Sequence, residues 1–246
     1  MLLLIDAGNT RVKWALAHPD AQAGTWVASG AALHAALDAL GAEWQGAGVK
    51  RAIVSNVAGL ALRERLAALL GAIEVEWFAS SAARAGLANG YREPQRLGCD
   101  RFAAAIGARA LAPDQALVVA TCGTATTVDA VTGDGRFAGG MILPGLALMA
   151  GALARNTAQL PQATPGAAPP PLFADNTNDA IVSGCLSAQA GAIERAVGAH
   201  GDALCILSGG AAPYIAPALK VAHKLVDNIV LVGLHAVALA DAAKGD

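Results

Sequence analysis

The strongest constraint on the fold is a short apolar run that ends in a glycine-containing turn, because this pattern occurs in both halves of the 246-residue chain. In the first half, Leu2–Ile5 leads into the turn Asp6–Thr10. Val12–Leu16 then alternates between apolar and polar positions, as a returning strand does. The segment therefore predicts a β-hairpin with its turn between paired strands.

The second half begins in the same way. An apolar strand at Ala116–Ala120 leads into the turn Thr121–Thr124, and a returning strand follows at 126–131. The repetition predicts two structurally related lobes. Because Pro113 stops the helix before this segment, we expect an N-terminal lobe at 1–113 and a C-terminal lobe at 114–246.

The remaining segments mix helical and extended patterns, which is typical of an α/β fold. We expect buried strands at 52–54 and 204–207, a proline-rich extended loop at 161–171, and helices at 31–40, 60–70, 102–112, 179–197 and after the apolar run 229–232. The uncharged stretch 137–154 is long enough to span a membrane. Its glycines and Pro144 interrupt it, so a loop followed by a buried helix to about Arg155 is expected instead.

Composition narrows the function classes. The net charge is −2 and no basic run occurs, which argues against nucleic acid or an anionic membrane as a partner and favours a small molecule. The start Met1–Asp6 has no basic region, so it does not read as a signal peptide. The four cysteines form no CxxC pair, which favours neither a zinc site nor a disulfide framework and fits a reducing cytoplasm.

The first turn has the chemistry of a phosphate site. Gly8 lets backbone amides approach an anion closely because no Cβ intervenes. Asn9 and Thr10 add neutral donors, and Lys13 adds a point charge. Asp6 would repel phosphate, so its expected role is to hold Mg²⁺, directly or through water. A plain hairpin turn explains the same residues equally well.

Gly123–Thr127 repeats this chemistry in the second half, with hydroxyls and backbone amides where a phosphate tail could lie. Threonine also favours strands for reasons of propensity alone. A third turn, Ser208–Gly210, either approaches the adenosine or begins a helix. Neither a GxxxxGK[ST] loop nor a GxGxxG turn occurs, so P-loop and Rossmann modes of nucleotide binding are disfavoured.

Asp100 stands before the helix expected at 102–112. It could cap that helix by accepting hydrogen bonds from free amides. It could equally act as a general base that takes a proton from an alcohol, with Arg101 orienting the substrate or balancing charge at the transferring phosphoryl group.

Together these residues make the chain resemble the type III pantothenate kinases, a family that also includes accessory factors, within the acetate-kinase, sugar-kinase, Hsp70 and actin superfamily. The matching motifs are Asp6-x-Gly8-Asn9-Thr10, Gly98-x-Asp100-Arg101, Gly123-Thr124-Ala125-Thr126-Thr127, Gly139-Gly140-x-Ile142-x-Pro144-Gly145 and Thr157-Ala158-x-Leu160-Pro161.

The resemblance implies two ribonuclease-H-like lobes of mixed sheet flanked by helices, with the active site in the cleft between them. It implies phosphorylation of pantothenate to 4'-phosphopantothenate by ATP with Mg²⁺, the first step of coenzyme A biosynthesis, by a cytoplasmic homodimer whose substrate site lies near the subunit interface. By motif position Asp100 is the proton acceptor. The implied substrate contacts are Tyr91, Gly98, Cys99, Asp100, Arg101 and Thr177, and the implied ATP contacts are Asp6, Ala7, Gly8, Asn9, Thr10, Arg11, Val12, Lys13 and Thr124.

One position departs from the family. Two residues before the glycine of the second phosphate motif, the family usually has an aspartate that binds a monovalent cation such as K⁺ or NH₄⁺, and here the residue is Thr121. A hydroxyl carries no full charge, so weak or absent activation by potassium is expected.

Two other functions remain open at this point: a kinase of the same superfamily that acts on acetate or a sugar, and a nucleotide-binding regulatory protein without catalysis. Cys99 and Cys122 lie beside the predicted turns, where they are either thiol-sensitive or simply small buried residues. The five histidines form no cluster and are expected to be surface or packing residues.

Overall fold

The computed structural model describes residues 1–201 and 203–245, which divide into two compact units. Unit 1 contains Met1–Pro113, Gly135–Phe137 and the residues from Ile229 onward, whereas unit 2 contains Asp114–Asp134 and Ala138–Asn228. The first change of unit comes directly after Pro113. The final helix, however, belongs to unit 1, so the second unit is shorter than the expected lobe 114–246.

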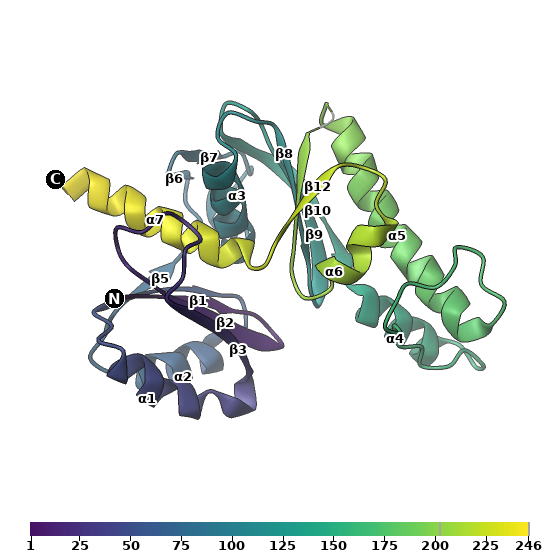
Figure 1. Cartoon of the computed structure of the whole chain (residues 1–246), viewed down its shortest axis with the longest axis horizontal. Coiled ribbons are helices and arrows are strands. Elements are labelled where there is room, and N and C mark those ends of the chain that lie inside the picture. The colour runs from purple at the N-terminus through teal and green to yellow at the C-terminus, as the bar shows by residue number, and fades with distance from the viewer. Residues whose placement is uncertain (202, 246) are drawn as a thin grey trace. The chain divides into compact units, whose positions relative to one another are not determined.

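Unit 1 is built on a five-stranded sheet of order β3-β2-β1-β4-β5. The strands are β1 (Leu2–Ala7), β2 (Arg11–Ala17), β3 (Ala28–Leu33), β4 (Arg51–Asn56) and β5 (Glu74–Phe78). The helical segments of the unit are η1 (His34–Ala36), α1 (Asp38–Gly46), α2 (Leu60–Leu70), η2 (Pro94–Arg96), α3 (Cys99–Leu111) and α7 (Ile229–Gly245), and a short hairpin is formed by β6 (Ala83–Arg84) and β7 (Leu87–Asn89). Helices α1 and α2 lie on one side of the sheet and α7 on the other (Figure 1).

The alternation of side chains along the strands builds the core of unit 1. Leu3 and Ile5 point to the same face of β1 because successive side chains alternate. They pack with Trp44 of α1 and Leu66 of α2, which are fully buried. Burial of this face fixes the register of the first hairpin, in which Asp6 pairs with Lys13.

Helices α3 and α7 cross in unit 1 with their backbones in contact. A Cβ at Gly107 would lie 2.5 Å from the carbonyl oxygen of Ile229, and a Cβ at Gly233 would lie 1.8 Å from that of Ala103. These distances are shorter than any real Cβ contact. Only glycine at both positions allows this crossing.

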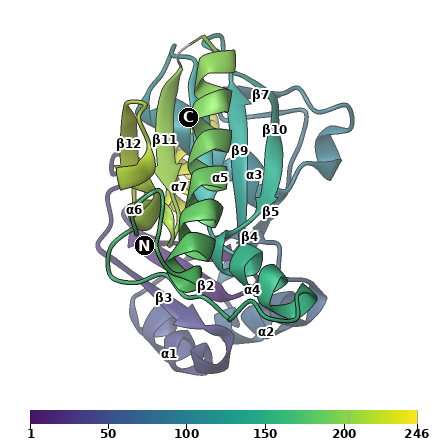
Figure 2. The same cartoon turned by 90° about the vertical axis from the view of Figure 1, so that its right-hand side faces the viewer.

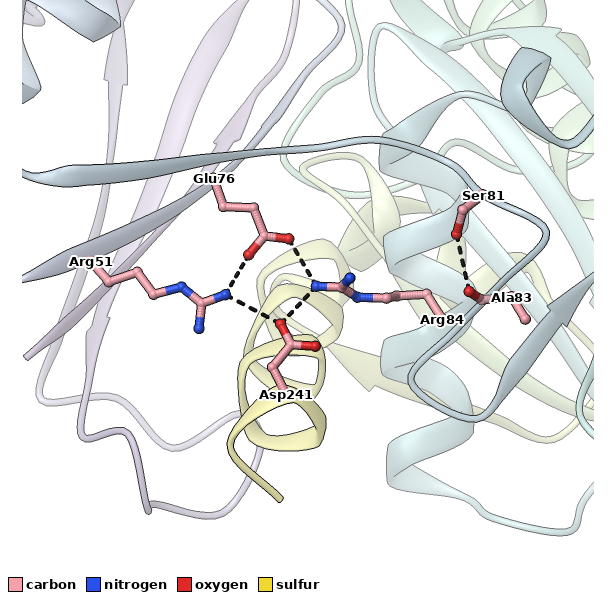
Figure 3. A network of polar contacts seen from close by, with 6 residues as sticks. All are labelled: Arg51, Glu76, Ser81, Ala83, Arg84 and Asp241. Atoms are coloured by element: carbon pink, nitrogen blue, oxygen red, sulfur yellow. Dashed lines mark hydrogen bonds and ion pairs between the residues drawn. The ribbon is translucent and has the colours of Figure 1, made fainter. Parts of the chain in front are cut away.

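A network of four charged side chains joins separate elements of unit 1 (Figure 3). Arg51 of β4 and Arg84 of β6 each form ion pairs with both Glu76 of β5 and Asp241 of α7. Exposed pairs contribute little singly, but a closed network of alternating charges contributes more. It fastens α7 and the β6–β7 hairpin to the edge of the sheet.

Unit 2 has a sheet of order β12-β11-β8-β9-β10. Its strands are β8 (Leu117–Cys122), β9 (Ala125–Val131), β10 (Arg136–Pro144), β11 (Leu204–Ser208) and β12 (His223–Val226), and its helical segments are α4 (Leu146–Asn156), α5 (Thr177–Ala199), α6 (Ala212–Ile215) and η3 (Ala216–Ala218). The first residues of β10, Arg136 and Phe137, belong to unit 1, where they pair with β7.

The two sheets have the same topology, which confirms the expectation of related lobes. In unit 1, β1 pairs antiparallel with β2 and parallel with β4, and β4 pairs parallel with β5. In unit 2, β8 pairs antiparallel with β9 and parallel with β11, and β11 pairs parallel with β12. The long helix α5 runs along the sheet of unit 2 (Figure 2), where Ile193 and Val197 pack with Val118 and Ala120.

Three predicted segments differ from the structure. Residues 31–33 end strand β3 rather than begin a helix, because they pair with β2, and Gly30 of the same strand lies against the indole of Trp14. Residues 136–144 form β10 rather than a loop, and residues 229–232 are already the first turn of α7. Among the described residues, no helix has both the length and the apolar character needed to cross a membrane.

We expect Gly233→Ala to destabilise unit 1 by about 1–3 kcal/mol, the usual cost of overpacking, because its methyl group would force α3 and α7 apart. The measurement is the thermal unfolding midpoint.

Gly191→Ala is the matched control. Gly191 is an exposed position of α5 whose Cβ would meet nothing within 4 Å, and there alanine should stabilise the helix by roughly 0.5–1 kcal/mol. A Gly233→Ala protein that unfolds at or above the wild-type midpoint would contradict the crossing described above.

Candidate active site

The turn after β1 is a tight hairpin with an open outer side. The amide of Gly8 donates to the carbonyl of Arg11 at 3.1 Å. Nε2 of His34 donates to the carbonyl of Gly8 at 2.9 Å. Among the predicted ATP contacts, Asn9, Thr10 and Arg11 are exposed, whereas Ala7 and Val12 are buried in the core. Ala7 and Val12 can therefore face a ligand only through their backbones.

The predicted acceptor motif, Gly98–Arg101, lies near the carboxyl-terminal end of β4, the strand next to β1. Asp6 is the register partner of Ser55 on the parallel strand β4. The hydroxyl of Ser55 lies 3.4 Å from Sγ of Cys99, and that thiol also donates to the carbonyl of Asn56 at 3.6 Å. The side chain of Cys99 thus faces β4, and the start of α3 is held beside the end of β1. Burial raises the pKa of the Cys99 thiol, which disfavours the thiolate, the reactive form.

Asp100 is inside the helix, and its interpretation as an N-cap is wrong. Helix α3 begins at Cys99, three residues earlier than expected, and its N-cap residue is Gly98, which makes no side-chain cap. Oδ1 of Asp100 accepts from the amide of Arg101 at 2.8 Å. Burial raises the pKa of Asp100, against the opposing effect of the Arg101 amide and charge. A more basic carboxylate is a better proton acceptor near neutral pH.

Arg101 lies against a pair of aromatic rings in unit 1. Its guanidinium carbon lies 5.7 Å from the ring centroids of both Tyr91 and Phe137. Nη1 donates to the hydroxyl of Tyr91 at 3.1 Å. Only 6% of Arg101 is exposed. The structure therefore brings Tyr91 together with the predicted motif Gly98–Arg101.

The second glycine turn, in unit 2, is surrounded by other backbone segments. The amide of Gly145 donates to the carbonyl of Thr124 at 2.9 Å, and a Cβ at Gly145 would lie 2.1 Å from the oxygen of Gly123. Gly209 has φ +98°, and a Cβ there would lie 2.3 Å from the oxygen of Cys122. Gly123 and Thr124 remain exposed. The result is a glycine-lined turn whose outer face an anion can reach.

A model of the type III pantothenate kinase family matches residues 2–199. The chain belongs to this family. It is 57% identical to a type III pantothenate kinase of Herminiimonas arsenicoxydans, over 97% of this chain and 98% of that protein. It is 48% identical to one of Cupriavidus taiwanensis, over 98% of each chain.

Solved structures show the same fold. A Baf family protein from Campylobacter jejuni superposes with a TM-score of 0.63 at 17% identity, covering 98% of this chain and 99% of that one. An activator of 2-hydroxyisocaproyl-CoA dehydratase from Clostridium difficile, with bound ADPNP, superposes with a TM-score of 0.52 at 13% identity, covering 99% and 96%. The two-lobed fold expected from the resemblance is confirmed.

Thr177, an implied substrate contact of the family motif, lies in unit 2. It is the exposed first residue of α5 and lines an open pocket of about 1020 Å³ between α4 and α5. The pocket wall is mostly apolar, with Met149, Leu153 and Ile181 among its residues. Asn176 caps α5 by accepting from the amide of Asp179 at 3.0 Å, so the position of Thr177 is well defined.

A cation at either glycine turn would have few protein side chains as ligands. Among the described residues, no group of three His, Cys, Asp or Glu side chains could hold a metal. A single carboxylate such as Asp6 suits Mg²⁺, which keeps several waters and phosphate oxygens as ligands. The register partners of Thr121 on the neighbouring strands are Thr127 and Ser208, whose side chains carry neutral hydroxyls. Oγ1 of Thr121 is buried and has no hydrogen-bond partner in the described part of the chain.

Sequence reasoning missed several residues of the site. Ser55 and Phe137 belong to no recognisable motif. They contact Cys99 and Arg101 only because of the way in which β4 and β10 pair with their neighbours. His34 was expected to be a surface or packing residue, yet its ring donates a hydrogen bond to the carbonyl of Gly8 in the first turn. Asn89, in Asn89-Gly90-Tyr91, gave a local signal, since asparagine before glycine marks a turn.

We expect Gly145→Ala to weaken nucleotide binding at least about tenfold, because the added methyl must push the Gly123–Thr124 turn out of place. Titration with a fluorescent ATP analogue would measure the affinity.

Gly198→Ala is the control, since a Cβ at this exposed position of α5 would meet nothing within 4 Å. Equal affinities for the analogue in both variants would show that the turn does not bind nucleotide.

Proposed function

We propose that this protein transfers the γ-phosphoryl group of ATP to the primary hydroxyl of pantothenate, giving 4'-phosphopantothenate, the first step of coenzyme A biosynthesis. The observation that carries the proposal is the half-buried carboxylate of Asp100, with a raised pKa, at the same sheet edge as the Gly8 turn. Membership of the type III pantothenate kinase family supports the choice of acceptor.

The nucleotide side of the site is made of backbone. The turn Asp6–Lys13 and Thr124 bind the phosphates through amides and hydroxyls, with Lys13 as a point charge. Asp6 holds Mg²⁺, which when bound neutralises charge on the phosphate oxygens. Backbone donors fixed in this way need not reorganise as charge develops, which favours the transition state over the ground state.

The acceptor side is made by the start of α3 and the loop before it. Asp100 accepts the hydroxyl proton as the oxygen attacks the γ-phosphorus in line. Arg101 and Tyr91 orient pantothenate, together with the backbone at Gly98 and Cys99. The thiol of Cys99 faces β4, so its contribution to substrate binding is through the main chain. Thr177 supplies a further contact.

We expect the purified protein to release ADP when pantothenate is added, and Asp100→Asn to lower turnover roughly 10²- to 10⁴-fold, the usual contribution of a positioned base. Because the pKa of Asp100 is raised in the wild-type protein, its carboxylate becomes protonated at a higher pH than that of an exposed aspartate. As the pH is lowered, the rate should therefore begin to fall at a higher pH. A coupled ADP assay across pH 5–9 measures both.

The alternatives predict different results in the same assay. A kinase for another acceptor would release ADP with acetate or a hexose instead of pantothenate. A regulatory protein without catalysis would bind ATP and release no ADP with any acceptor. A near-normal rate in the Asp100→Asn protein would remove Asp100 from the reaction.

Two copies pair, in this proposal, through the apolar surface of unit 2. The exposed side chains there include Ile142, Leu172 and Phe173, which are 65%, 66% and 92% exposed. In the proposed dimer the second copy would cover these side chains. The pocket that contains Thr177 lies in the same unit, in keeping with a substrate site near the subunit interface. The four unpaired cysteines suit a reducing cytoplasm.

We expect potassium to activate the wild-type enzyme weakly or not at all, because Thr121 lacks the charge of the usual aspartate. Thr121→Asp should create a saturable potassium stimulation. Rates measured in potassium buffer and in Tris buffer test this.

The same titration with Thr121→Asn, which replaces the hydroxyl with an uncharged amide about as large as the carboxylate, is the control. A large saturable stimulation of the wild-type enzyme would show that neutral oxygens are sufficient.

A further inference from the structure

The side chain of Asn89, at the end of β7, gathers three separate backbone groups in unit 1. Its Nδ2 donates to the carbonyls of Ser81 and Pro94, each at 3.1 Å. Its Oδ1 accepts from the amide of Tyr91 at 3.0 Å. Both donors and the acceptor of the amide are therefore used. The side chain ties the segment before β6 to the segment after β7.

The backbone beside Asn89 is fixed as firmly as its side chain. The amide of Asn89 donates to the carbonyl of Ala82 at 2.8 Å, and the amide of Gly90 donates to the carbonyl of Phe137 at 2.9 Å. A Cβ at Gly90 would lie 2.4 Å from that same oxygen. The chain is thus clamped against Phe137 one residue before Tyr91.

Tyr91 transmits this position to the acceptor motif. Its ring lies 5.9 Å from Phe137, edge to face. Its hydroxyl accepts from Arg101, whose guanidinium carbon is 5.7 Å from both rings. Arg101 is adjacent in sequence to Asp100, so a shift of Tyr91 would displace a buried cation at the site.

We propose that Asn89 is a positioning residue that holds Tyr91 and, through it, Arg101 in place for the acceptor substrate. The inference rests on the proposed function, since it takes Tyr91 and Arg101 as pantothenate contacts. An amide is required here because two carbonyl oxygens face Nδ2. A carboxylate of the same shape keeps the bond from the Tyr91 amide, loses both donors, and places negative charge against these carbonyls.

The test compares Asn89→Asp, Tyr91→Ala and the double variant, with KM measured separately for pantothenate and for ATP. We expect Asn89→Asp to raise the KM for pantothenate roughly tenfold, the effect of losing one hydrogen bond between a displaced Arg101 and the substrate, with the KM for ATP unchanged. In the Tyr91→Ala background the same substitution should change the KM less than about twofold, since coupled residues are not additive.

Gln45→Glu is the matched control. Nε2 of Gln45 donates to the carbonyl of Leu69 at 3.0 Å in unit 1, so this change also sets a carboxylate against a carbonyl, at a position outside the proposed site. It should leave both KM values unchanged. Asn89→Ala, which removes the bonds without adding charge, replaces Asn89→Asp if the latter does not fold.

The results distinguish failure of the positioning role of Asn89 from failure of the proposed function. If Tyr91→Ala raises the KM for pantothenate but the Asn89 variants only lower the unfolding midpoint, the positioning role is overturned and the proposed function stands. Equal effects of Asn89→Asp with and without Tyr91 also overturn it. If Tyr91→Ala leaves the KM for pantothenate unchanged, the assignment of Tyr91 fails, and the positioning role fails with it.

Discussion

Close approach of one backbone to another, at glycines that no other residue can replace, is the constraint on which both units depend. In unit 1 it allows α3 to cross α7 at Gly107 and Gly233. In unit 2 it seats Gly145 and Gly209 against the turn that follows β8. The first contact orients α3, whose first turn contains Asp100, and the second shapes a turn that faces solvent. The positions of α3 and of the turn after β8 are therefore set by main-chain contacts, which have little freedom to relax.

The chemistry of Asp100 reflects two opposing effects. Burial at the start of α3 favours the neutral acid, whereas the amide and the charge of Arg101 favour the carboxylate. The result is a carboxylate more basic than usual that still has a cation next to it. The aromatic rings of Tyr91 and Phe137 keep that cation in place without neutralising it. The surroundings of Asp100 thus depend on residues outside the motif that contains it.

The local sequence pattern predicted the strands on either side of the Gly8 and Gly123 turns, because a short apolar run that ends at a glycine turn fits few structures other than a hairpin. It failed at residues 31–33, where an alanine-rich segment suits a helix and only pairing with β2 makes it a strand. The site showed the same division. Asp100 and Arg101 could be found from adjacent letters, whereas Ser55, Asn89 and Phe137 reach them through strand pairing and loop closure that no short motif encodes.

The membership of α7 in unit 1 has a consequence for synthesis of the protein. Domains usually fold as they emerge from the ribosome, the N-terminal one first. Here the helix that packs against α3, and the carboxylate of Asp241 that pairs with Arg51 and Arg84, are translated only after all of unit 2. Until α7 has been translated, the side of α3 that packs against it stays uncovered in the nascent first unit. All of unit 2 is translated before the last helix of unit 1, so unit 2 can complete its core first.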